Sequence, residues 1–187
     1  MKNEKIWSLK IPIKISTKDK DIEKFFKICK SKLGLIPNII KTNSIDKKKF
    51  DAFNIFYNRL MQDDNYLTKI EKEMIAVAVS STNRCLYCCV SHGYTLGRLL
   101  KNIAKAKNIL INYEVAQISR KHKLMLDFAV KLTQSSHKIN EDDRKKLRKI
   151  KFNEFQILEI IEVTAFFNMT NRIASGTNMI PNKEYYN

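Results

Sequence analysis

The sequence contains few of the residues that interrupt helices and form tight turns. Only 4 Gly and 3 Pro occur among its 187 residues. An all-β protein needs such residues at its many turns, so their scarcity disfavours that class and favours helices. With 44% hydrophobic residues, a chain of this length can bury a sizeable core as one domain without disulfide bonds.

Long hydrophobic runs are also missing. No stretch approaches the roughly 20 apolar residues of a membrane-spanning helix. Near the start, Lys5, Lys10 and Lys14 interrupt any segment of signal-peptide length. We therefore expect a cytoplasmic protein with no membrane partner. In that reducing compartment, two neighbouring cysteines are more often catalytic or metal-binding than structural.

Arginine is scarce, although the formal net charge is +16 and 35 residues are basic. Proteins that bind nucleic acids tend to cluster their basic residues and to use Arg for bidentate contacts. The basic residues here are mostly scattered lysines, and the basic runs at 47–49 and 144–151 contain no aromatic residue. We therefore do not expect a nucleic-acid partner, and we attribute the charge to the solvated surface.

Apolar residues recur at helical spacing along most of the chain, which predicts an all-α fold. Gly34 is suited to end the first helix, and Thr68 with Glu71 forms the capping-box pattern that begins a later one. Residues 80–83 are typical of helix caps and should interrupt that later helix. The predicted helices cover about residues 19–33, 46–61, 69–79, the segment from the cysteines to residue 100, 102–109, 123–132, 141–149 and a long final stretch after Asn153.

The two ends of the chain differ from this pattern. Ile11, Ile13 and Ile15 alternate with polar residues, so residues 1–16 should form an extended arm lying on the body or on a partner subunit. Residues 17–178 should form a single helical domain, followed by a polar and loose tail at 179–187. The final helix is too apolar for a free surface and should lie in the core or in a subunit interface.

A short segment with two cysteines and a histidine carries the chemistry that the sequence suggests. Cys85 and Cys88 are three residues apart and His92 is four beyond Cys88, so a helix would place all three on one face. Thr82 or Asn83 should cap this helix, and the free N–H groups and dipole at its start would favour a thiolate. The histidine would supply a base, or an acid for a leaving alkoxide.

Glu73 is the candidate partner of this histidine. It lies in the preceding predicted helix, twelve residues before Cys85, and the residues after it are apolar. A buried carboxylate needs a partner, and His92 is the obvious one. The alternative is that Glu73 is an exposed charge near the start of its helix.

Other interpretations of the cysteines stay open at this point. Cys85, Cys88 and His92 could form half of a zinc site, but the sequence offers no second pair of ligands. Adjacent Cys88 and Cys89 cannot both point inward from one helix. Cys89 and Cys29 are therefore expected to be buried apolar residues.

The pattern Glu73, eleven residues, Cys85-x-x-Cys88-x-x-x-His92 resembles the active-site motif of the alkylhydroperoxidase D-like (AhpD-like) family, within the carboxymuconolactone decarboxylase superfamily. The resemblance covers about residues 30–178 and is nearest to an uncharacterized peroxidase-related subgroup. The resemblance extends past the motif residues themselves, over the segments 33–38, 72–80, 83–88, 126–132 and 166–174.

This resemblance implies an AhpD-like helical bundle that forms homo-oligomers, as dimers, trimers or hexamers. It implies reduction of hydrogen peroxide or an organic hydroperoxide, with Cys88 forming a sulfenic acid and Cys85 resolving it to a disulfide. Glu73 and His92 would form the proton relay. The redox-active disulfide would replace any bound cofactor, and an external dithiol or a thiol/disulfide reductase would reduce it.

Two positions depart from the family pattern, and they keep other functions in view. Tyr87 stands where some members have His, and Ser91 stands where peroxidase-related members often have a second His. One alternative is a different reaction of the superfamily, such as decarboxylation, although those relatives generally lack the cysteine pair. Another is a redox sensor or disulfide carrier, which the extra thiol of Cys89 motivates.

Overall fold

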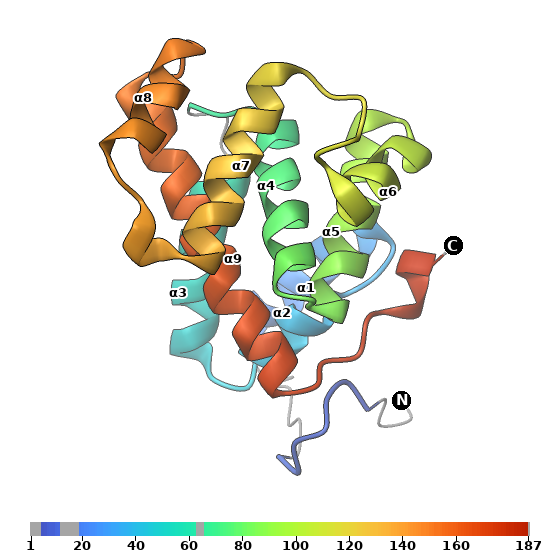
Figure 1. Cartoon of the computed structure of the whole chain (residues 1–187). Coiled ribbons are helices and arrows are strands. Elements are labelled where there is room, and N and C mark those ends of the chain that lie inside the picture. Colours follow the sequence, from blue (N-terminus) through green and yellow to red (C-terminus); the bar gives the residue numbers. More distant parts are fainter. Residues whose placement is uncertain (1–4, 12–18, 63–65, 187) are drawn as a thin grey trace.

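The computed structural model describes residues 5–11, 19–62 and 66–186, and this part of the chain is helical with no β-strand (Figure 1). The all-α prediction is therefore confirmed. In chain order the elements are α1 (Lys20–Leu33), α2 (Asn38–Asn43), α3 (Lys47–Tyr57), the π-helical turn η1 (Asn58–Gln62), α4 (Lys69–Thr82), α5 (Leu86–Leu100), α6 (Ile103–Asn112), α7 (Arg120–Gln134), the short η2 (Ser136–Lys138), α8 (Glu141–Lys149), α9 (Glu154–Gly176) and η3 (Lys183–Tyr186).

Helix α4 forms the centre of the molecule. Every residue from Glu71 to Ser80 is buried, because the sequence beyond Met74 is apolar on all sides of the helix. The helix packs against α5, α6, α7 and α9, which surround it in Figure 1. Charged groups inside this core must be paired, and the buried ammonium of Lys72 lies 3.0 Å from the Glu159 carboxylate.

Helix α9 is the longest element and packs against α4, α5, α7 and α8. Asn153 begins it with a capping box, in which its side chain accepts from the Gln156 N–H. One side is buried, including Phe166, Phe167 and Asn171. The opposite side is exposed and partly apolar, so the prediction of a helix too apolar for a free surface holds for one side only.

The observed helix ends agree with the predicted ones where the sequence has a capping box, and they differ from the prediction at other positions. Thr68 caps α4 with the predicted capping box, and Asn140 begins α8 in the same way. The predicted interruption at residues 80–83 is present but comes only at its last residue, because α4 continues through Thr82 and ends at Asn83. The helix predicted at 46–61 is regular only to Tyr57 and then widens into η1.

The two ends of the described chain lie side by side. The Ser8 N–H donates to the Thr177 carbonyl, and the Ile180 N–H donates to the Ile6 carbonyl, both at 2.9 Å. Ile6 and Trp7 are buried, so this part of the predicted arm lies on the body of its own chain. Ile13 and Ile15, on which the extended pattern also depended, lie outside the described residues.

The segment after α9 is packed, so the prediction of a loose tail is wrong for residues 179–186. Met179 and Asn182 are buried. The Asn182 side chain accepts from the Asn38 N–H at 2.8 Å and donates to the Ile36 carbonyl at 3.0 Å. The polar composition of this segment does not mean exposure, because its polar side chains satisfy the backbone groups around α2.

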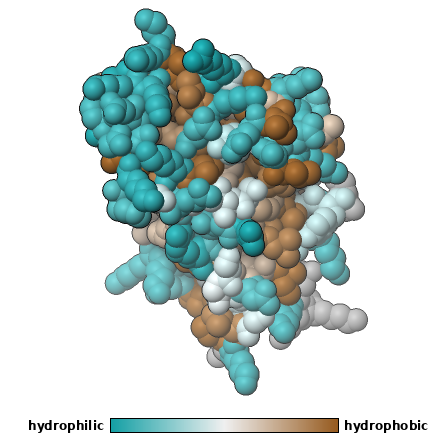
Figure 2. All heavy atoms as spheres, in the orientation of Figure 1, coloured by the Kyte–Doolittle hydropathy of each residue, from teal (hydrophilic) through white to brown (hydrophobic). Residues whose placement is uncertain are grey.

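The surface in the orientation of Figure 1 is unevenly polar. Figure 2 shows hydrophilic atoms densely covering α8 at the upper left, with hydrophobic atoms emerging elsewhere on the same face. In the described part of the chain, no helix combines the length and the apolar character needed to cross a membrane.

Candidate active site

The turn between α4 and α5 sets the position of both cysteines. Asn83 ends α4, and Arg84 takes a left-handed conformation with φ 52°, which reverses the chain at once. Cys85 is then the N-cap of α5, and its N–H donates to the Ser80 carbonyl at 3.0 Å. The prediction that Thr82 or Asn83 caps this helix is therefore wrong, and of Cys85 and Cys88 only Cys88 lies within the helix itself.

The two thiols interact across the first turn of α5. Both are free and buried, with Cys85 1% and Cys88 3% exposed. The Cys88 thiol hydrogen-bonds to Cys85 and lowers the pKa of Cys85 to about 6, against the effect of burial. The Cys88 amide and the Ser175 hydroxyl act in the same direction as the Cys88 thiol, and so does a positive charge on His92 whenever its ring is protonated.

The pKa of Cys88 moves in the opposite direction. Donating its proton to Cys85 raises this pKa far above its ordinary value, and burial and the negative charge on Cys85 add to the effect. The pair therefore shares one proton, with the negative charge resting on the sulfur at the helix N-terminus. The two thiols act as one titrating unit rather than as separate groups.

The other two cysteines lie in less activating surroundings. Burial, followed by the charge on Cys85, raises the pKa of the half-buried Cys89 thiol to about 11. Burial also raises the pKa of Cys29, as expected for a thiol that packs as an apolar group. Among the residues that the structure describes, no group of three or more His, Cys, Asp or Glu side chains is arranged to hold a metal ion.

Glu73 and His92 form the predicted pair. Glu73 Oε2 lies 2.8 Å from His92 Nδ1, and the two side chains are 6% and 16% exposed. An ionised carboxylate can only accept, so Nδ1 carries a proton and Nε2 is the basic nitrogen of the neutral ring. The His92 ring also meets the Phe167 ring edge to face, with centroids 4.6 Å apart. These two contacts hold the imidazole in one orientation.

Cys88, Glu73 and His92 line one cavity of about 570 Å³, which reaches from α1 and α2 to α5 and α9. Cys85 is not among its lining residues. Most of the wall is aromatic or aliphatic, and Lys32 and Lys69 are the other charged residues among the described residues that line it. Ligand pockets in proteins commonly measure about 300–1,000 Å³ and combine apolar walls with a few polar groups, as this cavity does.

The two residues that depart from the family pattern both have structural contacts. The hydroxyl of Tyr87 accepts from the Ile39 N–H at 3.1 Å and connects α5 to α2. Ser91 is buried, and its hydroxyl donates to the Cys88 carbonyl at 3.3 Å. Both side chains line the cavity. They support the wall around Cys88 but supply no additional base.

A network of side-chain amides behind the cysteines was not identified from the sequence. Asn83 Nδ2 donates to Asn168 Oδ1 at 3.1 Å and to Asn171 Oδ1 at 3.0 Å. Asn171 Nδ2 in turn donates to Ser80 Oγ at 3.1 Å. Asn171 belongs to one of the segments that carried the family resemblance, but an uncharged amide in a sequence does not reveal which group it contacts.

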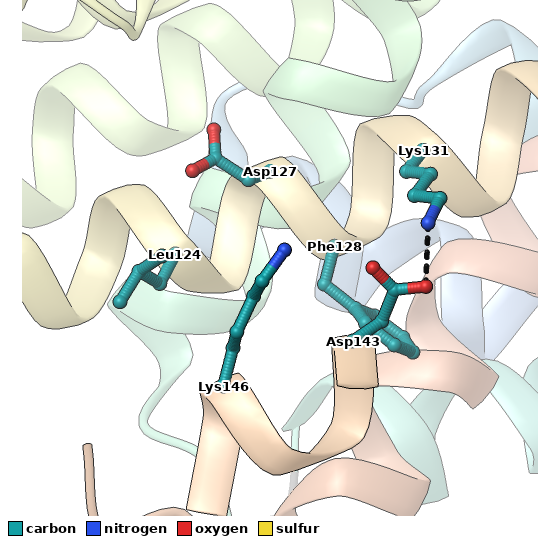
Figure 3. Close-up of a pocket in the computed structure, with 6 residues that line it drawn as sticks. All are labelled: Leu124, Asp127, Phe128, Lys131, Asp143 and Lys146. Carbon is teal, nitrogen blue, oxygen red and sulfur yellow. Dashed lines mark hydrogen bonds and ion pairs between the residues drawn. The ribbon is translucent and has the colours of Figure 1, made fainter. Parts of the chain in front are cut away.

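A second, smaller cavity of about 200 Å³ lies between α7 and α8 (Figure 3). None of the predicted site residues lines it. Its main ion pair joins Lys131 to Asp143 at 2.6 Å, and Asp143 also accepts from the Asn140 N–H in the cap of α8. These contacts join the two helices, so we regard this cavity as a junction in the fold.

Fold and site together define an all-helical protein with a cysteine pair and a carboxylate–histidine pair at one apolar cavity. The sequence profile of the carboxymuconolactone decarboxylase family matches residues 49–110. The structure of an uncharacterized peroxidase-related protein from Silicibacter sp. TM1040 is 42% identical, with a TM-score of 0.94, and the match covers 100% of this chain and 97% of that one. No curated protein sequence matches the chain.

Two further structures are similar. The alkylhydroperoxidase AhpD core protein from Ralstonia eutropha JMP134, also described as peroxidase-related, is 36% identical with a TM-score of 0.91, covering 98% of this chain and 96% of that one. The debrominase Bmp8 is 19% identical with a TM-score of 0.76 and covers 89% of both chains, which shows a common fold alone. The chain belongs to the AhpD-like group of the carboxymuconolactone decarboxylase superfamily, as the sequence motif predicted.

Proposed function

We propose that this protein is a thiol-dependent peroxidase that reduces hydrogen peroxide or organic hydroperoxides through a Cys85–Cys88 disulfide. The observation that carries the proposal is the shared cavity, in which Cys88 lies together with the Glu73–His92 pair. A second thiol of lowered pKa stands directly behind Cys88. The peroxidase-related relatives support the same class of activity.

Cys88 is the thiol that meets the peroxide, because it lines the cavity and Cys85 does not. In the resting pair Cys88 holds the shared proton, so it must lose that proton to react. The neutral imidazole of His92 accepts it at Nε2, while Glu73 stabilises the resulting positive charge through Nδ1. The carboxylate thus makes His92 a stronger base without touching the peroxide.

In the first step the Cys88 thiolate attacks the terminal oxygen of the hydroperoxide. A sulfur–oxygen bond forms, the oxygen–oxygen bond breaks, and Cys88 becomes a sulfenic acid. The other oxygen leaves as an alkoxide, and His92 returns its proton to give the alcohol. Sulfur is oxidised by two electrons and the peroxide is reduced by two.

In the second step the Cys85 thiolate attacks the sulfur of the sulfenic acid. With a pKa of about 6, Cys85 is ionised at neutral pH and needs no base of its own. A disulfide forms, and hydroxide leaves and takes up a proton to become water. An external dithiol then supplies two electrons and two protons, which restores both thiols and oxidises the donor to a disulfide.

The walls of the cavity favour hydroperoxides with an apolar body. Phe53, Phe166 and Phe167 belong to the lining, and a volume of about 570 Å³ is far larger than hydrogen peroxide needs. Burial of an apolar group against these rings would add binding free energy that hydrogen peroxide cannot supply. We therefore expect a lower KM for a bulky hydroperoxide such as cumene hydroperoxide than for hydrogen peroxide.

The proposal is tested by intact mass and thiol count before and after one equivalent of cumene hydroperoxide, followed by peptide mapping. Loss of two thiols and about two mass units, mapped to Cys85–Cys88, is the expected result for one disulfide. Cys88→Ser should abolish peroxide consumption, Cys85→Ser should trap a sulfenic acid on Cys88, and Cys89→Ser is the matched control that retains turnover. Full turnover in Cys88→Ser would refute the proposal, and turnover that survives loss of both cysteines would point to a different reaction on this fold.

A further inference from the structure

The cavity that contains Cys88 has a buried part and a part that is open to solvent. Cys88 and Glu73 are buried where they line it, and the His92 side chain is only 16% exposed. Exposed residues of α1 and η1 line the same cavity, among them Lys32 and Gln62. A ligand can therefore enter beside α1 and η1 and extend inward to the sulfur of Cys88.

Two lysines contribute positive charge to the wall of this cavity. Lys32 lies in the last turn of α1 and is exposed, and Lys69 is the first residue of α4 and is half-buried. Within the described part of the chain, neither ammonium group forms an ion pair or a hydrogen bond. The Glu73 carboxylate, which also lines the cavity, is paired with His92. The two ammonium groups are therefore the charges that an anionic ligand would meet.

The position of Lys69 separates this charge from the reacting sulfur. Lys69 and Glu73 are one turn apart on α4, so they lie on the same side of the helix with about 6 Å of rise between them. Glu73 in turn holds His92, one turn after Cys88 on α5. An anion at Lys69 and a peroxide at Cys88 therefore occupy different parts of the cavity. One molecule can reach both only if a chain connects its two functional groups.

The rest of the wall indicates what kind of chain this is. It is mainly apolar, with the aromatic side chains of Phe25, Phe53, Phe166 and Phe167. A hydrocarbon chain gains binding free energy against such a surface, whereas a polar chain would lose hydrogen bonds to water without replacement. A volume of about 570 Å³ is in the range for one drug-sized ligand, so we expect one chain rather than a lipid with two.

We propose that the substrates are long-chain carboxylic acids that carry a hydroperoxide group along the chain, as fatty acid hydroperoxides do. Lys32 and Lys69 bind the carboxylate and so determine specificity. This inference rests on the proposed peroxidase function and names its substrate class. The oxygen–oxygen bond of the substrate breaks at Cys88 as in the first step above, which gives the hydroxy acid and leaves the carboxylate unchanged.

The test first measures binding of a ligand that cannot react. Isothermal titration calorimetry compares ω-hydroxydodecanoic acid with its methyl ester, which keeps the chain and lacks the charge. The parent should bind the acid about fivefold more tightly than the ester, as expected for one exposed ion pair. In Lys32→Gln/Lys69→Gln the acid should lose this advantage, whereas the affinity for the ester should not change.

Two control variants separate the cavity lysines from the general positive charge of the protein. Lys27→Gln/Lys30→Gln removes two exposed charges from α1 that do not line the cavity, and it should keep the preference for the acid. Lys32→Arg/Lys69→Arg retains both charges and should also keep it. With linoleic acid hydroperoxide and its methyl ester as substrates, Lys32→Gln/Lys69→Gln should raise KM for the acid alone and leave kcat unchanged.

Equal affinity of the parent for acid and ester would overturn the inference, even where the protein is an active peroxidase. An equal loss of the preference in Lys27→Gln/Lys30→Gln would overturn it as well, because the effect would then belong to the overall charge. A preference that depends on Lys32 and Lys69 supports the ligand class, even where no hydroperoxide is consumed. Binding and turnover therefore distinguish failure of this inference from failure of the proposed function.

Discussion

His92 Nδ1 lies 2.8 Å from Glu73 Oε2 although 19 residues separate them in the sequence. The contact connects the buried centre of α4 with the second turn of α5, and it directs the other ring nitrogen away from the carboxylate. The core helix of the molecule therefore carries one of the two groups of the proposed proton relay. Loss of the carboxylate should have a larger effect on catalysis than on folding.

Glu73→Gln tests this relationship. The amide keeps the shape of the side chain but cannot stabilise a positive imidazole, so proton removal from Cys88 should slow. We expect kcat/KM for cumene hydroperoxide to fall by about 10²-fold, which is the lower end of the range for general acid–base catalysis. Steady-state kinetics with excess dithiol measures the change.

Glu71→Gln is the matched control for this substitution. Glu71 is buried on the same helix, but its carboxylate faces Thr68, Lys121 and His122 and it does not line the cavity. Its kcat/KM should stay within about twofold of the parent value at temperatures where both proteins are folded. Equal loss of activity in both variants would show that the effect of Glu73→Gln is a general disturbance of α4.

The cysteine pair should contain a thiolate at neutral pH. Since the pKa of Cys85 is lowered to about 6, absorbance at 240 nm should rise with a midpoint near pH 6 in the reduced protein. This transition should disappear in Cys85→Ser, whereas Cys89→Ser should retain it, because the pKa of Cys89 is raised to about 11. A pair whose first ionisation appears only near pH 9 would contradict the geometry at the start of α5.

Glu71 should make stability depend on pH in the acid range. The contact with His122, whose Nε2 lies 3.7 Å from Glu71 Oε1, lowers the pKa of Glu71 to about 2, below its ordinary value of 4.5, and Thr68 and Lys121 act in the same direction. The unfolded chain therefore binds this proton first as the pH falls. The stabilisation is complete above about pH 4.5 and is lost as the pH falls toward 2.

The Glu71→Gln variant should accordingly be less stable than the parent at pH 7, by about 1–3 kcal/mol after allowance for solvent screening. The difference should shrink between pH 4.5 and pH 2, because Gln can still form the capping box with Thr68 and only the charge is removed. Urea unfolding at several pH values measures this. A difference that is constant with pH would show that the charge contributes nothing.

The exposed side of α9 is where we expect a second copy of the chain to bind. Phe155, Leu158, Met169 and Ile173 are 60%, 51%, 45% and 42% exposed and recur along one stripe of the helix. In an antiparallel pairing about a two-fold axis near Phe167, Glu162 would face Arg172 of the partner subunit, and Ala165 would face the partner's Met169. One alignment of the two helices therefore satisfies both the pairing of opposite charges and the packing of a large side chain against a small one.

Charge reversal tests that register. Glu162→Arg should weaken self-association by about tenfold or more, because it places two like charges together in each half of the interface. Glu162→Arg/Arg172→Glu should restore it, and Glu114→Arg, the same change at an exposed residue outside the stripe, should have no effect. Sedimentation velocity measures the state of each variant. A monomeric parent, or a double variant as weak as the single one, would refute the pairing.

The pairing of Glu73 with His92 could be predicted from the sequence because a buried carboxylate needs an ion-pair or hydrogen-bond partner. A carboxylate inside an apolar helix requires a partner, and the histidine on the next helix was the nearest suitable group. The helical fold could be predicted for a similar reason, since apolar residues at helical spacing must be buried together. Strong caps such as Thr68 and Asn140 placed individual helix ends correctly.

The start of α5 could not be predicted in the same way. Asn83 is the C-cap of α4, Arg84 links the two helices in a left-handed conformation, and Cys85 is the N-cap of α5. A non-glycine residue in a left-handed conformation has no reliable sequence signal, so the sequence pattern predicts the cap too early in the chain. The contacts of Asn171 were also beyond the sequence, because its partners are 88 and 91 residues away.

Residues 179–182 follow in the sequence all the helices against which they pack, and Met179 belongs to the same buried cluster as Cys85 and Cys88. During translation, α4 and α5 leave the ribosome long before this segment does. A nascent chain therefore holds both sulfur atoms without their cover for the time needed to synthesise α6 to α9. The order of synthesis, rather than the finished fold, determines how long these thiols are open to premature oxidation.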